Sequence, residues 1–364
     1  MSQEIDLDQL QDSTDALRSA VAQLEAGEIV AVPDEVGMLL LVLPSADSGV
    51  QNLLKVHQQI TSTFPVVALA HPSVIYDCEA EVSELTEKLA RRCWPGPVAI
   101  RTPSESKDNI CESWTDSARS WSVTEHGRAF IVPAGIFAVQ LLRELSSPAL
   151  GLMVSQSEFE SIDENRISLS IIKKEIPYPD GLTVVRVQGA GYQLEQTGIV
   201  SETILSRLTG EVYIFVCTGN TCRSPMAEAI FRNLLANKLG CQDDELLDRG
   251  YTVISAGLAA YPGAPASSDA VRLLKADGID LSNHESQPVT QELLLHCDHV
   301  YTMTQSHLDA ILNSLPELAG KARLLSDSGK DVSDPIGAGL EEYTKCRDEI
   351  EGYLKTLLDQ QTFK

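Results

Sequence analysis

Basic residues are scarce in this 364-residue chain, which has 28 Lys and Arg against 52 Asp and Glu and a formal net charge of -24. Non-specific binding to nucleic acid needs many cations that neutralise phosphates, and a negative overall field repels them. We therefore do not expect a nucleic-acid partner. Any phosphate group that this protein handles must be held by a local arrangement strong enough to overcome that field.

The sequence also lacks the features of an export signal or a membrane anchor. Residues 1–10 are acidic and have no apolar core, and the longest apolar runs, such as residues 37–43, are far too short to span a bilayer. The eight cysteines show no spacing typical of a four-ligand zinc site or of a disulfide framework. We therefore expect a cytoplasmic protein with no membrane anchor, no metal ion and no cofactor.

Length and composition predict two globular domains. Apolar residues make up 43% of the sequence and charged residues 22%, which are ordinary values for folded proteins. At roughly 150 residues per domain, a chain of this length corresponds to two domains. A short connection ends at Gly210, directly before a β-branched and aromatic stretch, and predicts domains at 1–209 and 210–364. The sequence leaves the oligomeric state open.

Both halves alternate between apolar runs typical of strands and amphipathic stretches typical of helices. In the first half this pattern favours an α/β domain with a mixed sheet. Its expected helices lie at 10–25, 82–92 and 138–145, and its expected strands at 29–32, 38–43, 66–70, 129–132 and 150–154. The second half predicts a doubly wound parallel sheet. Its expected strands lie at 211–216, 251–255 and 299–303, and its expected helices at 266–276, 340–358 and from Ser224 onward.

The segment between the strand at 211–216 and the next helix has the features of a phosphate-binding loop. Backbone N–H groups of such a loop, with the positive end of the helix dipole, bind a tetrahedral oxyanion without a basic surface. Gly219 and Asn220 suit the left-handed backbone angles that curl such a loop, and Arg223 offers a planar fork for two phosphate oxygens. The expected phosphate-binding residues are Thr218, Gly219, Asn220, Thr221, Cys222 and Ser224.

Cys217 begins this loop and is the candidate nucleophile. Donors that bind phosphate also stabilise a thiolate, the reactive form of cysteine, and Ser224 can donate a hydrogen bond that helps it leave. Asp334, on a turn-rich stretch stiffened by Pro335, is the candidate general acid for the leaving group. Such an acid contributes on the order of 100-fold to 10,000-fold in rate. The same carboxylate can then activate water against a cysteinyl-phosphate intermediate.

The segment from Glu211 onward resembles the low-molecular-weight protein phosphatases. The resemblance rests on residues 217–229, on residues 255–257 and on the Asp-Pro pair at 334–335, whose order and spacing fit the family over the whole second half. It implies that Cys217 is the catalytic nucleophile, that Arg223 binds the phosphate, and that Asp334 is the catalytic acid. It also implies a phosphorylated protein as the substrate partner.

Residues around the loop bear on the choice of substrate. Most tyrosine-directed members carry a bulky aliphatic residue at the position of Thr221, and aromatic residues where this chain has Ile336 and Gly337. The run 217–228 is similar to that of bacterial protein-arginine phosphatases, and a threonine leaves room for a planar guanidinium and can orient water. We therefore expect phosphoarginine as the favoured substrate and phosphotyrosine as the alternative. Ile336 departs from the phenylalanine expected of the arginine type.

Several residues near the loop have a structural as well as a functional interpretation. In this family a cysteine at the position of Cys222 can form a protective disulfide with the nucleophile under peroxide, and it can equally be a small buried residue. His284 occupies a position near the substrate rim of related phosphatases, and a structural hydrogen-bonding role is favoured for it. Cys241, Cys297 and Cys346 belong to no motif, so we expect them to pack in the core.

The first half resembles the threonylcarbamoyl-AMP synthase (YrdC-like) domain in the order and spacing of four short segments. These segments are residues 32–35, 94–97, 132–133 and 154–157. Lys55 is retained, but Asp34 replaces a threonine, and His57 and Ile131 replace arginines. Because an ATP site needs positive groups and hydroxyls at such points, we expect a catalytically degenerate domain. The alternatives are threonylcarbamoyl-AMP synthesis or the binding of another ligand by this domain.

Overall fold

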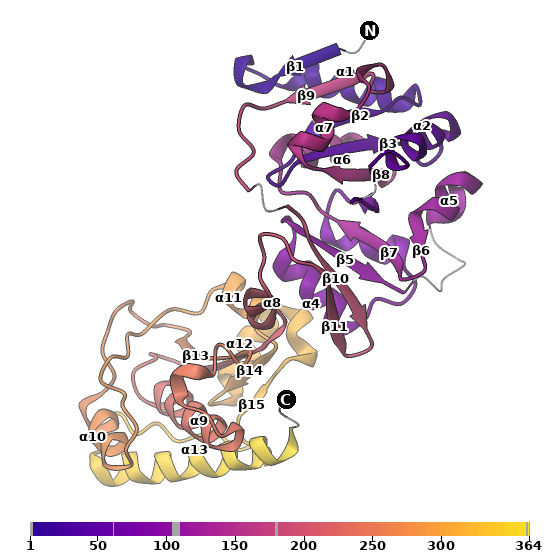
Figure 1. Cartoon of the computed structure of the whole chain (residues 1–364). Coiled ribbons are helices and arrows are strands. Elements are labelled where there is room, and N and C mark those ends of the chain that lie inside the picture. Colours follow the sequence, from indigo (N-terminus) through magenta and orange to yellow (C-terminus); the bar gives the residue numbers. More distant parts are fainter. Residues whose placement is uncertain (1–2, 61, 104–109, 179–180, 362, 364) are drawn as a thin grey trace. The chain divides into compact units, whose positions relative to one another are not determined.

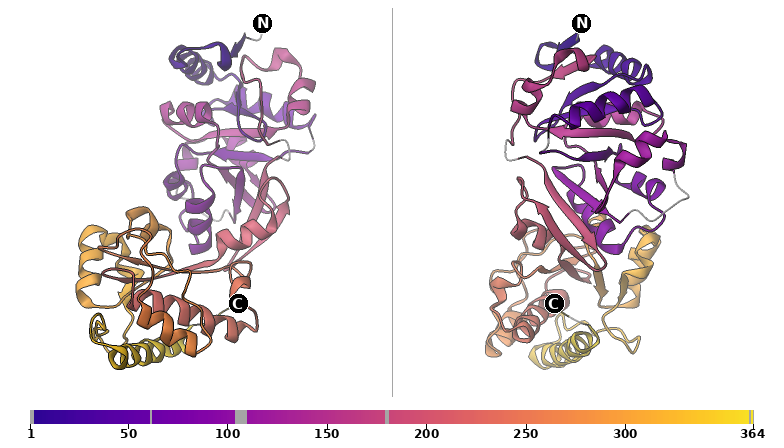
Figure 2. Two further views of the ribbon diagram at one scale, coloured as in Figure 1. Left: turned by 90° about the vertical axis from the view of Figure 1, so that its left-hand side faces the viewer. Right: turned by 45° about the vertical axis from the view of Figure 1, so that its right-hand side comes forward.

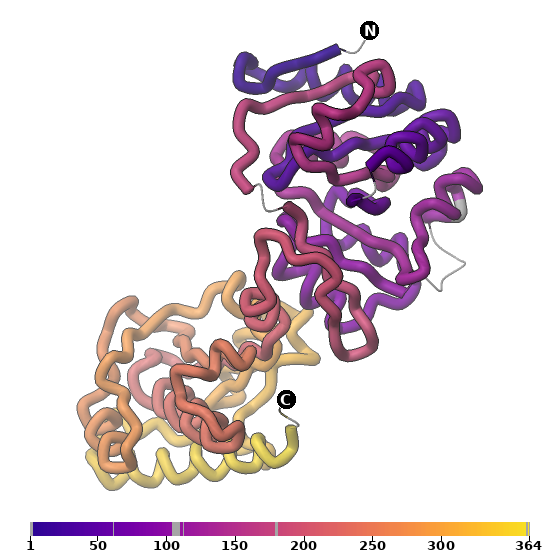
Figure 3. The backbone as a smooth tube through the Cα atoms, in the orientation of Figure 1, coloured from indigo at the N-terminus to yellow at the C-terminus, as the bar shows by residue number. Residues whose placement is uncertain are grey.

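The chain divides into two units, Met1–Leu208 (unit 1) and Thr209–Lys364 (unit 2), each with its own sheet and its own apolar clusters. The computed structural model describes residues 3–60, 62–103, 110–178, 181–361 and 363. The elements are labelled in Figure 1, and their path can be followed in the turned views of Figure 2 and the backbone trace of Figure 3. Both units mix helices with strands, which confirms the predicted α/β fold class.

Unit 1 is built on a mixed sheet of eleven strands within the described residues. These strands are β1 (Gln3–Asp6), β2 (Val30–Pro33), β3 (Met38–Val42), β4 (Pro65–Ala68), β5 (Val98–Thr102), β6 (Val123–Thr124), β7 (Gly127–Ile131), β8 (Ala149–Val154), β9 (Leu169–Ile172), β10 (Thr183–Gln188) and β11 (Gly191–Gln196). The order is β1-β9-β2-β3-β8-β4-β7-β5-β10-β11, with β6 paired to β7. The pair β4 and β7 is parallel and the pair β3 and β8 is antiparallel, so the sheet is mixed as predicted.

Helices cover both faces of this sheet, which explains why β3 is apolar throughout. The helices are α1 (Thr14–Glu25), α2 (Asp47–His57), α3 (Ile75–Cys78), α4 (Glu84–Cys93), α5 (Asp116–Ser122), α6 (Ile136–Glu144), α7 (Gln156–Ser161) and α8 (Glu202–Thr209). Successive side chains of a strand point to opposite faces of a sheet. Met38, Leu40 and Val42 accordingly join the cluster that contains α2 residues, whereas Leu39 and Leu41 join the cluster that contains residues of α1 and α6.

Unit 2 has a four-stranded sheet in which all described pairs are parallel. Its strands are β12 (Glu211–Cys217), β13 (Tyr251–Gly257), β14 (His299–Thr302) and β15 (Ala322–Leu324), and its helices are α9 (Arg223–Leu239), α10 (Ser268–Ala276), α11 (Gln291–His296), α12 (Gln305–Ser314) and α13 (Leu340–Gln360). Residues of α9, α10 and α13 share one apolar cluster, and residues of α11 and α12 share another. The sheet is therefore covered on both faces, as the predicted doubly wound fold requires.

The strand order of unit 2 determines where a ligand can meet several elements at once. The order is β13-β12-β14-β15, so β12, the first strand of the unit, lies between two later strands. In open sheets of this kind, ligands bind beyond the carboxyl ends of the strands where the strand order reverses. The segments that follow β12 and β14 therefore meet at one edge of the sheet.

Helix α9 begins directly beyond that edge. It starts at Arg223, one residue before the predicted start, and Pro225 in its first turn needs no hydrogen-bond partner for its nitrogen. Gly240, with a φ of 65°, ends the helix in the left-handed conformation that glycine adopts without strain. Within the described ranges, no helix combines the length and the apolar character that a membrane crossing requires.

Candidate functional site

Cys217, the last residue of β12, lies at the start of the loop that leads into α9. Its side chain is buried, with 3% of the residue exposed. The Ser224 hydroxyl oxygen lies 3.0 Å from the Cys217 sulfur, and the backbone N–H of Asn220 donates to the same sulfur over 3.3 Å. Two hydrogen-bonding groups therefore converge on one thiol at a helix N-terminus, the environment that stabilises a thiolate.

Asn220 organises the loop from inside. It is fully buried and has a φ of 54°, the left-handed angle predicted for it. Its amide nitrogen donates to the hydroxyls of Ser224 at 3.0 Å and Ser255 at 2.8 Å, while its amide oxygen accepts the Gln287 N–H at 2.8 Å. The prediction of a left-handed angle for Gly219 is wrong, because Asn220 alone turns the loop in this way.

A second layer of polar residues supports Asn220. The Ser255 hydroxyl donates to Glu228 on α9 at 2.6 Å, and burial raises the pKa of the Glu228 carboxyl. His284 lies with Nε2 2.8 Å from the Asn220 carbonyl oxygen, in agreement with the structural role favoured for it. The loop is therefore braced from β13, α9 and the segment after α10.

Gly257 allows the end of β13 to approach this loop closely. A Cβ atom on Gly257 would lie 2.6 Å from the Thr218 carbonyl oxygen and 2.8 Å from the Asn220 nitrogen. The backbone beyond it also binds the loop, since the N–H groups of Leu258 and Ala259 donate to the carbonyls of Cys217 and Thr218 at 3.0 and 2.8 Å. Any side chain at position 257 would push this strand away from the loop.

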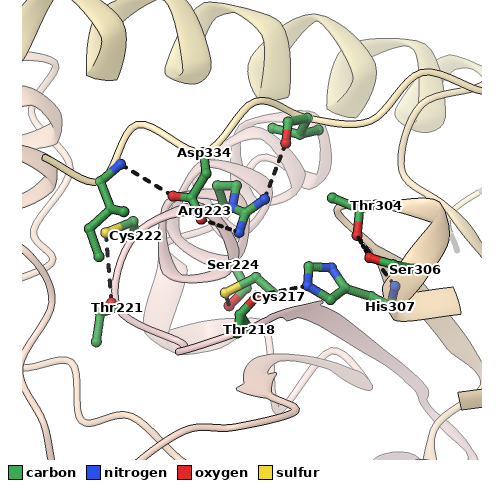
Figure 4. Close-up of polar contacts among 12 residues, drawn as sticks. Cys217, Thr218, Thr221, Cys222, Arg223, Ser224, Thr304, Ser306, His307 and Asp334 are labelled. Carbon is green, nitrogen blue, oxygen red and sulfur yellow. Dashed lines mark hydrogen bonds and ion pairs between the residues drawn. The ribbon is translucent and has the colours of Figure 1, made fainter. Parts of the chain in front are cut away.

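Arg223 and Asp334 meet directly, although 111 positions separate them. Arg223 Nη2 lies 2.5 Å from Asp334 Oδ2, and Nη1 donates to the Val332 carbonyl at 3.2 Å. The Arg223 side chain is 6% exposed, whereas that of Asp334 is 45% exposed. Figure 4 shows this pair on one side of Cys217. The structure therefore brings the three predicted catalytic residues into one place, with the carboxylate open to solvent.

Thr221 and Cys222 continue the loop toward α13. The Cys222 sulfur lies 3.0 Å from the Tyr343 hydroxyl, and the Thr221 hydroxyl lies 3.7 Å from the same sulfur. Burial raises the pKa of Tyr343 to about 12. Cys222 is buried and both it and Cys217 are free thiols, so the disulfide between them stays a prediction.

His307 is a residue of the site that the sequence analysis missed. It lies in the first turn of α12, and its Nε2 is 2.9 Å from the Thr218 hydroxyl oxygen (Figure 4). Burial, reinforced by the positive charge of Arg223, lowers the pKa of His307. Position relative to the sheet could have revealed it, because it follows β14, the parallel neighbour of β12.

Known proteins match this chain in two parts. The low molecular weight phosphotyrosine protein phosphatase family matches residues 212–364, and the telomere recombination family (Sua5, YciO and YrdC) matches residues 22–194. The protein-arginine-phosphatase of Bacillus subtilis is 40% identical over 151 residues, which cover 40% of this chain and 94% of that protein. The chain belongs to the low-molecular-weight protein phosphatase family. The model of the second family matches the other half, so two family matches lie side by side in the sequence.

Further relatives match the same half as the phosphatase family. A probable low molecular weight protein-tyrosine-phosphatase, EpsP of Ralstonia nicotianae, is 32% identical over 139 residues, covering 38% of this chain and 87% of that protein. The solved structure of a YwlE mutant from Bacillus subtilis is 37% identical, covers 42% of this chain and 98% of its own, and superposes with a TM-score of 0.37. The family thus includes relatives named for arginine and for tyrosine.

In unit 1, His57 at the position of a family arginine is held by its neighbours. Its Nδ1 accepts the Trp121 indole N–H at 3.1 Å, and its Nε2 lies 3.1 Å from the Thr63 carbonyl oxygen. A carbonyl oxygen only accepts, so Nε2 carries the hydrogen and the imidazole is neutral. Both ring nitrogens are therefore occupied within the protein.

Ser155 and Asp34, at two other motif positions of unit 1, are also engaged. Ser155 caps α7 and forms a reciprocal pair with Glu158, whose carboxylate accepts the Ser155 N–H at 2.7 Å. Burial opposes ionisation of Glu158, but hydrogen bonds from Ser62 and Ser155 outweigh it and lower its pKa. Asp34 is 4% exposed, and burial raises its pKa even though Oδ1 accepts the Gly135 N–H at 2.5 Å. Ser155 and Asp34 therefore form hydrogen bonds within unit 1, and Asp34 places a carboxyl group where the family has a threonine hydroxyl.

Proposed function

We propose that unit 2 hydrolyses phosphorylated proteins by nucleophilic attack of Cys217, through a cysteinyl-phosphate intermediate. The observation that carries this proposal is the convergence of the Ser224 hydroxyl and the Asn220 N–H on the Cys217 sulfur, beside Arg223 and Asp334. A protein that only captured phosphate would need the loop and the arginine but not a thiol held by donors. Family membership supports the same reaction class.

The first step forms a bond between the Cys217 sulfur and phosphorus and breaks the bond to the leaving group. Arg223 presents five N–H donors, of which the contacts to Asp334 and Val332 use only part, and the rest suit the transferring phosphoryl oxygens. Asp334 in its protonated form donates a proton to the departing atom, which its exposed position makes possible.

The second step releases inorganic phosphate. Asp334, now a carboxylate, accepts a proton from water, whose oxygen attacks phosphorus as the sulfur–phosphorus bond breaks. The electron pair of that bond returns to Cys217, where the Ser224 hydroxyl and the Asn220 N–H stabilise the thiolate. Ser224 is fully buried and also hydrogen-bonded to Asn220, so its hydroxyl is fixed for this task.

Phosphoarginine is the substrate that we favour, with phosphotyrosine as the alternative. Thr221 is small and partly exposed at the loop. The contact described for its hydroxyl is a long one, to the Cys222 sulfur. Ile336, which is 66% exposed, differs both from the aromatic residue of the tyrosine-directed type and from the phenylalanine expected of the arginine type, so it favours neither substrate. Two relatives named as protein-arginine-phosphatases, from Bacillus subtilis and Geobacillus stearothermophilus, support the same choice.

We also propose that unit 1 does not make threonylcarbamoyl-AMP. The neutral His57, whose two ring nitrogens are both hydrogen-bonded within the protein, supports this assignment, because the family has an arginine there and ATP phosphates need cations at such points. Glu158, whose pKa is lowered, adds a negative charge next to the segment 154–157. Release of pyrophosphate that depends on threonine, bicarbonate and ATP together would overturn it.

Paired peptides test the substrate. The full chain is given matched peptides that carry phosphoarginine or phosphotyrosine, and the release of inorganic phosphate is followed. A higher kcat/KM for the phosphoarginine peptide is the expected result. Preference for the phosphotyrosine peptide would assign the protein to the tyrosine-directed type, and release from neither peptide would contradict the proposed function.

A further inference from the structure

One hydrogen bond joins the residue after the nucleophile to a helix from a distant part of unit 2. The Thr218 hydroxyl oxygen lies 2.9 Å from His307 Nε2 (Figure 4). Thr218 follows β12, and His307 follows β14, so the bond spans the edge of the sheet where the strand order reverses. The contact therefore links the nucleophile loop to the adjacent strand connection.

The buried position of His307 suits an apolar side chain equally well, so the hydrogen bond to Thr218 is what distinguishes a histidine at this position. The residue is 6% exposed, and its Nδ1 is buried with no hydrogen-bond partner among the described residues. An unsatisfied buried nitrogen costs free energy of folding, and a leucine would fill the same space without that cost. What a leucine cannot provide is the hydrogen bond from Nε2 to Thr218.

The charges around His307 favour its neutral form. The charges that act on it within the described residues are those of Arg223 in α9 and of Asp331 and Asp334 in the segment before α13. Burial and Arg223 lower the pKa of His307, and the two aspartates offset only part of this effect. His307 also lies in the first turn of α12, where the helix dipole disfavours a positive charge.

Thr218 is held by one hydrogen bond to its backbone and one to its side chain. Its carbonyl oxygen accepts the Ala259 N–H at 2.8 Å, which fixes the backbone, while its side chain is at the surface. A neutral imidazole can accept from or donate to the Thr218 hydroxyl, whereas a protonated imidazole can only donate to it. Protonation would also bury a charged N–H at Nδ1 without a partner.

We propose that His307 is a positioning residue for the phosphatase reaction: its neutral imidazole fixes Thr218, and with it the loop beside Cys217, and protonation weakens this hold. The inference rests on the proposed function of unit 2. It differs from the roles of Cys217, Arg223 and Asp334, because His307 acts through Thr218 and touches no reacting atom.

A double-mutant cycle tests the link. H307L and T218V each remove the bond, so each is expected to lower kcat/KM of the full chain by about tenfold on a phosphorylated peptide. The double variant is expected to lose no more than the worse single variant, because both changes remove one interaction. Losses that multiply in the double variant would overturn the inference. H296L, at an exposed histidine of α11, serves as the control and is expected to match the wild type.

The pH dependence separates positioning from mere packing. H307Q offers an amide that can reach Thr218 but does not titrate, so it is expected to recover most of the H307L loss at neutral pH. Because the ordinary pKa of 6.5 is lowered in the folded protein, the ratio of kcat/KM for H307Q to wild type should rise as pH falls below 6.5. A ratio that is independent of pH would contradict the proposal.

A readout without turnover completes the test. The ring signals of His307 are followed by NMR between pH 4 and 8 in the wild type and in T218V, and the midpoint is expected to move with the substitution. An unchanged midpoint would overturn the link to Thr218. If the wild type hydrolyses no phosphorylated peptide, the proposed function fails and the catalytic part of this inference fails with it; activity combined with multiplying losses overturns the inference alone.

Discussion

In unit 2, two hydrogen-bonding groups converge on a single sulfur atom. At the motif positions of unit 1, the polar side chains form hydrogen bonds with other residues of the same unit. In unit 2, Ser224 and Asn220 both point to the Cys217 sulfur. In unit 1, the two ring nitrogens of His57 are taken by Trp121 and Thr63. A side chain whose hydrogen-bonding capacity is already filled has none left for a substrate.

Under the proposed assignment of unit 1, this contrast explains how two units that both match families can differ in activity. Both units match known families over most of their length. In unit 2 the loop leaves a thiol and part of a guanidinium for the phosphoryl group, despite the acidic character of the whole chain. In unit 1, hydrogen bonds lower the pKa of Glu158, whose carboxylate accepts a hydrogen bond from Ser155 at 2.8 Å and adds negative charge beside that motif position.

The largest expected effect is the loss of the nucleophile. Cys217→Ser should lower the release of phosphate from a phosphorylated peptide by about 10,000-fold or more, because the serine hydroxyl is not ionised at neutral pH. Phosphate release is measured under single-turnover conditions. Cys241→Ser, at a half-buried cysteine outside the loop, is the matched control and should retain activity. Activity of Cys217→Ser close to that of the wild type would show that Cys217 is not the nucleophile, and the contrast between the two units would fail.

Loss of the general acid comes next. Asp334→Asn keeps the size of the side chain but cannot donate a carboxyl proton, so kcat should fall by about 100-fold or more. Asp327→Asn, an exposed acid earlier in the same stretch, should stay close to the wild type. If both variants lose the same small amount, the contact of Asp334 with Arg223 is structural and another group supplies the proton.

A smaller change is expected in substrate preference. Thr221→Ile fills the space beside the loop with an aliphatic side chain, so the ratio of kcat/KM for phosphoarginine over phosphotyrosine peptides should fall about tenfold. Thr221→Ser, which keeps a hydroxyl and adds no bulk, is the control. A preference for phosphotyrosine that is present in the wild type and survives Thr221→Ile would refute the assignment to arginine.

The smallest effect concerns unit 1, where His57 is predicted to stabilise the fold rather than to bind a ligand. Trp121→Phe removes the N–H that His57 accepts and should lower the free energy of unfolding by about 1 kcal/mol, with phosphatase activity unchanged. All three tryptophans, Trp94, Trp114 and Trp121, lie in unit 1, so the remaining indole fluorescence reports urea unfolding of that unit. Unchanged stability would weaken the structural role of His57.

Much of the fold follows from local sequence patterns. The alternation of apolar runs and amphipathic stretches predicts β12, β13, β14 and α13 to within a few residues. Strands β9, β10 and β11 of unit 1 are not among the expected elements. β9 has only four residues, too few for periodicity to mark, and it is placed by pairing with β1 and β2, which are far away in the sequence.

The residues of the site likewise fall into those that local sequence predicts and those that depend on the fold. Residues 217–224 are predictable because one short loop and one helix start carry the whole arrangement. The hydrogen-bond partners of that loop come from distant parts of the sequence. They are Ser255 in β13, Gln287 after α10, His307 after β14 and Tyr343 in α13. Their proximity depends on the strand order and on helix packing, which local patterns do not specify.

Trapping the covalent intermediate tests the central claim most directly. Asp334→Asn, in which the second step should be slow, is mixed with a phosphorylated peptide and quenched, and the thiols are mapped by mass spectrometry. We predict a phosphoryl group on Cys217 that is absent from Cys241 and that disappears when Cys217 is replaced. Turnover of the peptide without any phosphoryl group on Cys217 would contradict the account.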